Sequence, residues 1–184
     1  MRVGAVVLAA GASTRLGEPK QLVRLGAETL LERTVRMARE AGCSPVVVVL
    51  GASAALIQAA CELANAIIVV NEGWAEGMGS SIRTGVAALP DVDACVVMTC
   101  DMPAVTIGHL RLLMASGEVR ASSYAGRRGV PAYFPVGTFQ SLLALRGDVG
   151  ARDLLRSAHC VELNGGELDV DTVEDLERAK QLFG

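Results

Sequence analysis

An α/β fold with a mainly parallel sheet is predicted by the order and the composition of the chain. Short apolar runs typical of buried strands alternate with segments in which apolar residues recur every three or four positions, as along helices. Hydrophobic residues make up 51% of the 184 residues and aromatic residues only 3%, so we expect an aliphatic core of valine-rich strands covered by helices. This alternation implies right-handed crossovers between parallel strands. The length predicts one domain over residues 1–184.

The positions of the apolar runs predict the individual elements. Strands are expected at residues 2–8, 45–50, 66–70 and 94–98, with shorter ones at 122–124, 132–134 and 160–163. Helices are expected from about Leu30 to a terminating Gly42, and at residues 53–63, 80–89, 107–115, 151–157 and 173–183. Ligands of such sheets bind at the carboxyl ends of the strands. The loops after residues 8, 70 and 98 are therefore expected to meet at one edge.

The loop after the first predicted strand has the composition of a phosphate-binding loop. Residues 8–21 read LAAGASTRLGEPKQ and place the cations Arg15 and Lys20 among glycines. Five residues separate Gly11 from Gly17, which does not fit the Walker loop, and Ser13 breaks the dinucleotide-binding fingerprint. The loop is thus a long, basic phosphate loop of a third kind, which suits a triphosphate. The alternative is a surface loop whose two cations are merely solvated.

Asp101 is a candidate metal ligand. It follows the most hydrophobic predicted strand in the sequence VVMTCDMP, so its carboxylate is expected at the binding edge. A carboxylate that faces a triphosphate suits Mg²⁺, which takes few protein oxygens and several phosphate oxygens. The alternative is an Asp that caps the next helix or turn. That helix is expected to begin nearer Thr106, which is too far along the chain for such a cap.

A second carboxylate, Asp171, precedes the last predicted helix in the sequence LDVDTVEDL, which also contains Asp169. Thr172 and Asp175 have the spacing of a helix cap. From these residues alone, Asp171 is either a metal ligand or the N-cap of this helix.

The segment NEGWAEGMGSSIRTG follows the third predicted strand. Gly77 and Gly79 allow the backbone to approach a ligand closely, and Ser80 and Ser81 can cap the next helix and donate hydrogen bonds. Helix N-termini at this edge suit polar ligands, so we expect base and ribose to bind here. The alternative is a glycine-rich turn with Ser80 as an ordinary N-cap.

The phosphate loop resembles the signature of the nucleotidyltransferases that share the nucleotide-diphosphosugar transferase fold, a GT-A-like and Rossmann-like three-layer architecture. Leu8-Ala9-Ala10-Gly11, Arg15-Leu16-Gly17 and Lys20 match that signature position by position. The resemblance implies that Arg15, Lys20 and Asp101 act in catalysis and that Asp101 and Asp171 bind Mg²⁺. It also implies a nucleotide site made by Leu8, Ala9, Ala10, Gly11, Arg15, Lys20, Gly77, Gly79, Ser80 and Ser81.

Two further motifs narrow the resemblance. Residues 124–134, YAGRRGVPAYF, and residues 147–155, GDVGARDLL, are similar to segments of the molybdenum cofactor cytidylyltransferases and their close relatives. With the earlier motifs, this resemblance covers nearly the whole chain. It implies that the acceptor substrate contacts Arg128, Gly129, Pro131, Asp148, Gly150 and Arg152. Many relatives have His where this chain has Val130, so one contact to the acceptor is missing here.

The implied reaction is nucleotidyl transfer. An acceptor phosphate attacks the α-phosphorus of a nucleoside triphosphate, and pyrophosphate leaves. The resemblance implies CTP as donor, molybdenum-carrying molybdopterin as acceptor and a molybdenum enzyme as recipient of the product. Open alternatives are GTP or ATP as donor, a sugar or sugar-acid acceptor, and a non-catalytic carrier of pterin or nucleotide.

Composition argues against several other classes of protein. A net charge of −3 and the scarcity of aromatic residues speak against binding nucleic acid. No apolar run is long enough to span a membrane, and the first strand begins too early for a signal peptide. The five cysteines show no Cys-x-x-Cys spacing, as expected of reduced thiols in a cytoplasmic protein.

Overall fold

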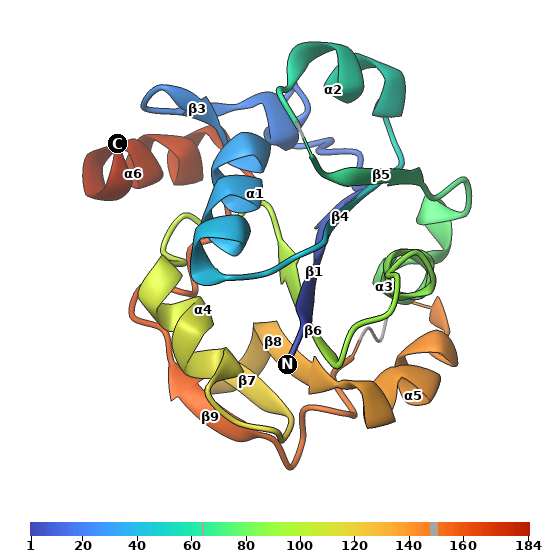
Figure 1. Cartoon of the computed structure of the whole chain (residues 1–184). Helices are drawn as coiled ribbons and strands as arrows, with labels where there is room; N and C mark the ends of the chain where they lie inside the picture. The colour runs from blue at the N-terminus through green and yellow to red at the C-terminus, as the bar shows by residue number, and fades with distance from the viewer. Residues whose placement is uncertain (64, 148–150) are drawn as a thin grey trace.

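The computed structural model describes residues 1–63, 65–147 and 151–184, and within them a seven-stranded sheet runs through the molecule (Figure 1). The strand order is β5-β4-β1-β6-β8-β7-β9. Every neighbouring pair is parallel except the two that involve β8, which is antiparallel to β6 and β7. The strands are β1 (Val3–Ala9), β4 (Val46–Leu50), β5 (Ile67–Val70), β6 (Ala94–Thr99), β7 (Arg120–Tyr124), β8 (Arg127–Pro135) and β9 (His159–Glu162). The predicted α/β class is confirmed.

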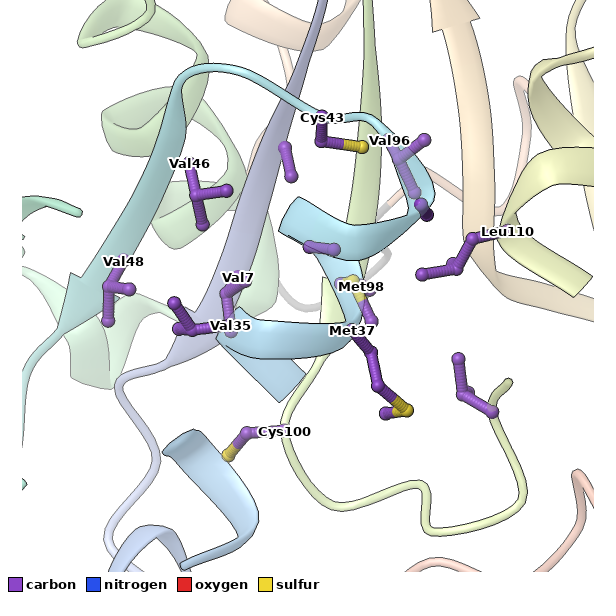
Figure 2. Packing of buried hydrophobic residues seen from close by; sticks show 14 of the residues in the cluster. Val7, Val35, Met37, Cys43, Val46, Val48, Val96, Met98, Cys100 and Leu110 are labelled. Carbon is purple, nitrogen blue, oxygen red and sulfur yellow. The ribbon is translucent and has the colours of Figure 1, made fainter. Parts of the chain in front are cut away.

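Helices cover both faces of this sheet and make three layers. They are α1 (Leu30–Ala41), α2 (Ala54–Ala60), α3 (Met78–Ala87), α4 (Ile107–Met114), α5 (Phe139–Leu143) and α6 (Val173–Phe183), with short 3₁₀ turns η1 (Lys20–Leu22), η2 (Trp74–Glu76) and η3 (Val136–Thr138). On one face α1, α2 and α4 pack on valines such as Val7 and Val48, as Figure 2 shows for α1. On the other face α3 and α5 pack on Val6 and Val49.

A third, smaller cluster of buried residues lies beside this sheet. It joins α6 to the two-stranded hairpin of β2 (Arg24–Leu25) and β3 (Glu28–Thr29). Leu16 of the basic loop and Val170, next to Asp171, both belong to this cluster. Burial of these two apolar side chains therefore brings the basic loop beside the segment that precedes α6, although about 150 residues separate them in the chain.

The structure differs from the sequence-based expectation in three elements. Residues 151–157 form turns, so the predicted helix there is wrong. Ala151, Leu155 and Ala158 are nonetheless buried, because the turns present one apolar side to the sheet with the spacing of a helix. The hairpin β2–β3 and helix α5 were not predicted, since elements of two and five residues are too short to show a period.

The strand order reverses direction at β1. The chain moves from β1 to β4 and β5 on one side, and then returns to place β6 on the other side of β1. A crevice forms at such a point because the connections leave in opposite directions. Helix α3 lies close over it, since Gly85 leaves no room for a side chain between the helix and Val6 and Val49. The ends of β1 and β6 and the start of α3 therefore border one crevice.

Among the described residues, none of the helices combines the length and the apolarity that crossing a bilayer requires.

Candidate active site

A pocket of about 330 Å³ occupies the crevice at the carboxyl ends of β1 and β6. It is lined by the end of β1, the basic loop, the η2–α3 connection and the end of β6: Leu8, Ala9, Ala10, Gly11, Lys20, Gln21, Trp74, Ala75, Gly77, Met78, Ser81, Thr99, Cys100 and Asp101. A larger depression of about 880 Å³ on the outer side of α1 is lined by none of the predicted site residues, so it has no link to the predicted chemistry. The smaller pocket is the candidate active site.

A cluster of four charged side chains stands at one end of the pocket. The ammonium of Lys20 donates to Asp101 Oδ2 at 2.5 Å and to Asp171 Oδ1 at 2.8 Å. Arg15 Nη2 donates to the other oxygen of Asp171, Oδ2, at 2.9 Å. The side chains of Lys20 and Asp101 are 18% and 13% exposed, whereas Arg15 is 69% exposed. Ion pairs between largely buried partners are stronger than exposed ones, so Lys20 and Asp101 form the centre of the cluster.

Local hydrogen bonds hold the basic loop against the end of β1. The backbone N–H of Lys20 donates to Ser13 Oγ at 3.0 Å. The amide of Gln21 is fully buried and donates to the carbonyls of Ala9 and Gly11 at 2.8 and 3.2 Å. On the other side of the cluster, Val170 N–H donates to Asp101 O at 2.9 Å. These hydrogen bonds hold Lys20, Asp101 and Asp171 in position.

Neither aspartate of the cluster caps a helix. The N-cap of α4 is Thr106, whose side chain accepts from His109 N–H. The N-cap of α6 is Thr172, which forms a capping box with Asp175. The alternative left open for Asp171 by the sequence is thus removed, because its carboxylate is bonded to Lys20 and Arg15.

The charges in the cluster alter each other's protonation. Burial acts to lower the pKa of Lys20, but Asp101 and Asp171 outweigh it and raise this pKa above its usual range. Partial burial, together with the charges of Asp101 and Asp171, raises the pKa of Asp169 to about 7. At neutral pH Asp169 is therefore only partly ionised, while Lys20 and Arg15 balance the charges of Asp101 and Asp171.

Asp101 also has an oxygen without a partner. Its Oδ1 is buried and makes no hydrogen bond, while Oδ2 faces Lys20. Within the described part of the chain, no three acidic, His or Cys side chains are grouped as a complete metal site. Two carboxylates and a triphosphate fit the few protein ligands that Mg²⁺ takes, so Asp101 and Asp171 suit a shared metal–phosphate site.

A neutral network of hydrogen bonds lies behind the pocket wall and reaches it through Ser81; this part of the site is called the neutral end. Asn71 follows β5, and its Nδ2 donates to Ser80 Oγ at 2.8 Å and Ser81 Oγ at 3.0 Å. The predicted capping role of Ser80 and Ser81 is wrong, because the N-cap of α3 is Gly77 and no side chain caps it. The N-cap Gly77 has φ 119°, which residues with a side chain rarely adopt. The helix therefore begins directly after this glycine and not at the serines that the sequence offered as caps.

Gly79 lies away from the pocket lining. A Cβ at this position would meet Gly147 O, so the glycine permits a close approach of α3 to the loop after α5. Ser81 lines the pocket, whereas Ser80 does not.

Four of the residues predicted to bind the acceptor are described by the structure, and these four do not line this pocket. Arg128 donates to Arg156 O at 2.8 Å and to Cys160 Sγ at 3.1 Å. Gly129 and Pro131 lie in β8, where Pro131 O accepts from Ser122 Oγ, and Arg152 is exposed in the turns after α5. Asp148 and Gly150 lie outside the described residues. The acceptor contacts therefore stay a prediction.

Several residues of the site were not singled out from the sequence. Gln21, Trp74, Met78 and Thr99 line the pocket, and Asn71 supports its neutral end. Trp74 is the one tryptophan in the chain, which is a signal that the sequence did offer. Gln21 and Asn71 act through side-chain amides, whose partners only the tertiary structure reveals.

Comparison with known proteins agrees with this geometry. Residues 5–163 match the MobA-like NTP transferase domain. The chain is 36% identical to nicotine blue oxidoreductase of Paenarthrobacter nicotinovorans, over 96% of this chain and 95% of that protein. It is 24% identical to the molybdenum cofactor cytidylyltransferase of Escherichia coli K12, over 98% and 97% of the two chains.

Solved structures of other proteins have the same fold as this chain. The crystal structure of Rv0371c from Mycobacterium tuberculosis H37Rv superposes with a TM-score of 0.87, at 33% identity and with 98% of each chain covered. A complex of that protein with manganese superposes with a TM-score of 0.81, at 32% identity, and covers 99% of this chain and 100% of that one. The match over residues 5–163 shows that this chain belongs to the MobA-like NTP transferase family.

Proposed function

We propose that this protein transfers a nucleoside monophosphate from a nucleoside triphosphate to a phosphorylated acceptor. The observation that carries the proposal is the cluster of Lys20, Asp101 and Asp171 at one end of a pocket in the crevice between β1 and β6. A phosphate oxygen of the acceptor forms a bond to the α-phosphorus, and the bond from that phosphorus to the bridging oxygen breaks. Pyrophosphate leaves with the electron pair of the broken bond.

The basic loop supplies what this reaction needs from the protein. The acceptor is already an anion, so no strong base is required, and catalysis rests on alignment and charge neutralisation. Lys20 and Arg15 hold the phosphates and stabilise the charge on departing pyrophosphate. The backbone of Leu8, Ala9, Ala10 and Gly11 lines the pocket beside Lys20 and positions the nucleotide. Gly77, Gly79, Ser80 and Ser81 belong to the segment that holds base and ribose, with Ser81 on the pocket wall.

Asp101 and Asp171 are the residues that would hold Mg²⁺. The buried and unpartnered Oδ1 of Asp101 supports this assignment. A divalent ion bound there supplies charge neutralisation at the phosphate oxygens. The manganese complex of the mycobacterial neighbour is consistent with a divalent metal in a protein of this fold.

For the substrates, we propose CTP as donor and molybdenum-carrying molybdopterin as acceptor, with a molybdenum enzyme as recipient. The similarity of residues 124–134 and 147–155 to the molybdenum cofactor cytidylyltransferases supports this pair, as does the 24% identity to the enzyme of E. coli. Arg128, Gly129, Pro131, Asp148, Gly150 and Arg152 would then face the acceptor. Val130 and the higher identity to a protein named an oxidoreductase make the acceptor the first point to test.

The test is pyrophosphate release with Mg²⁺, molybdenum-loaded molybdopterin and CTP, GTP or ATP in parallel. Release with CTP alone supports the full proposal, whereas release with another nucleotide replaces the donor but keeps the reaction. Lys20→Ala should lose turnover, and Lys180→Ala is the matched control because this lysine forms an exposed ion pair with Glu177 on α6. No release of pyrophosphate from any of the three triphosphates would contradict the proposal.

A further inference from the structure

Asn71 is a buried polar residue at the neutral end of the pocket, and the reaction proposed above gives it no role. It is 6% exposed, and hydrogen bonds fix its backbone: Asn71 N–H donates to Leu50 O at 2.7 Å, and Asn71 O accepts from Trp74 N–H at 3.2 Å. Its side-chain Oδ1 accepts from Gly73 N–H at 3.0 Å. The side-chain amide is thus held in one orientation, with its NH₂ group directed at α3.

Two adjacent serines accept hydrogen bonds from this NH₂ group. Their own hydroxyl hydrogens differ in whether they have an acceptor. Ser80 Oγ accepts from Asn71 and donates towards Gly73 O and Gly77 O, at 3.0 and 2.9 Å. Ser81 Oγ also accepts from Asn71, but no described residue accepts its hydrogen. Both serines are buried, at 3% and 5% exposure, yet only Ser81 lines the pocket.

The polarity of the hydrogen bond from Asn71 decides what Ser81 offers to a ligand. An NH₂ group can only donate, so it occupies a lone pair of Ser81 Oγ and leaves the hydroxyl hydrogen for another partner. A buried donor without an acceptor costs free energy, which a ligand acceptor in the pocket would recover. We propose that Asn71 is a positioning residue that directs the Ser81 hydroxyl, as a donor, towards an acceptor atom of the nucleotide base.

The chemistry of the surrounding wall favours the base as the part that Ser81 meets. Trp74, Ala75 and Met78 line the pocket on the same η2–α3 segment, while Lys20 and Asp101 come from the loops after β1 and β6. Apolar and aromatic side chains suit a flat heterocycle, and charged ones suit phosphates. The acceptor is therefore a carbonyl oxygen or an unprotonated ring nitrogen of the base. This inference rests on the proposed function.

The pair Ser81→Ala and Thr84→Val tests it, because each variant removes one hydroxyl from α3. Thr84 Oγ1 donates to Ser80 O at 3.0 Å and does not line the pocket. The dissociation constant for CTP with Mg²⁺ is measured by calorimetry, and the fluorescence of Trp74 reports whether the pocket is occupied. Ser81→Ala should weaken CTP binding about five- to tenfold, the scale of one lost hydrogen bond. Thr84→Val should change CTP affinity less than twofold. Equal losses in both variants, or none in Ser81→Ala, would overturn the inference.

Asn71→Asp reverses the polarity at nearly constant shape. A carboxylate accepts hydrogen bonds, so it would draw the Ser81 hydrogen away from the pocket. CTP affinity should fall as in Ser81→Ala, and the double variant should be no weaker than either single one. In turnover, the KM for CTP should rise with kcat unchanged, as expected when uniform binding is lost. If Asn71→Asp does not fold, the comparison of Ser81→Ala with Thr84→Val still tests the inference.

The outcomes separate this inference from the function on which it rests. If the wild-type protein binds CTP and Ser81→Ala binds it equally well, only the role of Asn71 and Ser81 falls. If the wild-type protein binds no triphosphate and releases no pyrophosphate, the proposed function fails and the inference fails with it.

Discussion

The two ends of the pocket are built in different ways. At the neutral end, Asn71, Ser80 and Ser81 are all less than 7% exposed, and the Asn71 amide has a partner for each of its polar atoms. At the charged end, Lys20, Asp101 and Asp171 satisfy one another through ion pairs, and Asp101 Oδ1 has no partner. The neutral end is thus ready to receive a ligand, whereas the charged end must exchange partners when phosphates arrive.

This exchange follows from the position of Lys20. Its ammonium stands between the two carboxylates proposed to bind the metal, so in the free protein it fills the place of the cation. Asp101 Oδ1 is without a partner, but Lys20 and Arg15 occupy the two oxygens of Asp171, so a metal ion that uses Asp171 would have to displace one of them. A triphosphate would offer Lys20 new anionic partners, and Asp101 and Asp171 would then be free to hold a divalent ion, which would neutralise phosphate charge.

The largest effect is expected from Asp101→Asn, which keeps the shape of the side chain and removes its charge. Turnover should fall about 10²–10³-fold, or roughly 3–4 kcal/mol of transition-state stabilisation, the scale of removing one preorganised charge contact. Steady-state pyrophosphate release measures this loss. Asp153→Asn is the control, since Asp153 pairs with Arg156 on the surface. Unchanged turnover in Asp101→Asn would remove Asp101 from the mechanism.

A second effect concerns metal binding without nucleotide. Lys20→Met removes the internal cation, so the free protein should bind Mn²⁺ about tenfold more tightly than the wild type, a difference of about 1.4 kcal/mol. Titration followed by the electron paramagnetic resonance of free Mn²⁺ measures this without turnover. Lys180→Met should bind Mn²⁺ as the wild type does. Weaker binding in Lys20→Met would show that Lys20 supports the metal site instead of occupying it.

The charged end could be predicted from the sequence because its signals are local. Asp101 and Lys20 each follow an apolar run, and the carboxyl ends of parallel strands share one edge of the sheet. The position of Asp171 next to them came from a motif, and the structure explains it by the bond from Val170 N–H to Asp101 O.

The neutral end could not be predicted to the same depth. The partners of Asn71 depend on the direction of one amide relative to a helix whose start the sequence placed two residues late. Serine is a common N-cap residue, but the hydroxyl of Ser80 donates to Gly77 O, three residues earlier in the chain. Likewise, residues 151–157 have a helical spacing of apolar residues and form turns. In both cases local composition fits two conformations, and tertiary packing selects one.

The smallest effect tests whether the carboxylates at the charged end lower the free energy of unfolding. Asp169 has a pKa of about 7 against an ordinary value of 3.8, so between these values the folded protein keeps a proton that the unfolded chain has released. The contribution of Asp169 to the free energy of unfolding should therefore fall as the pH rises from about 4 to 7. Asp169→Asn removes this loss, so in metal-free buffer it should melt roughly 2–4 °C above the wild type at pH 8, with little difference at pH 4.

The same shift at both pH values would mean that packing, and not repulsion from Asp101 and Asp171, explains the gain. A shift at pH 8 alone would show that repulsion among these carboxylates destabilises the fold.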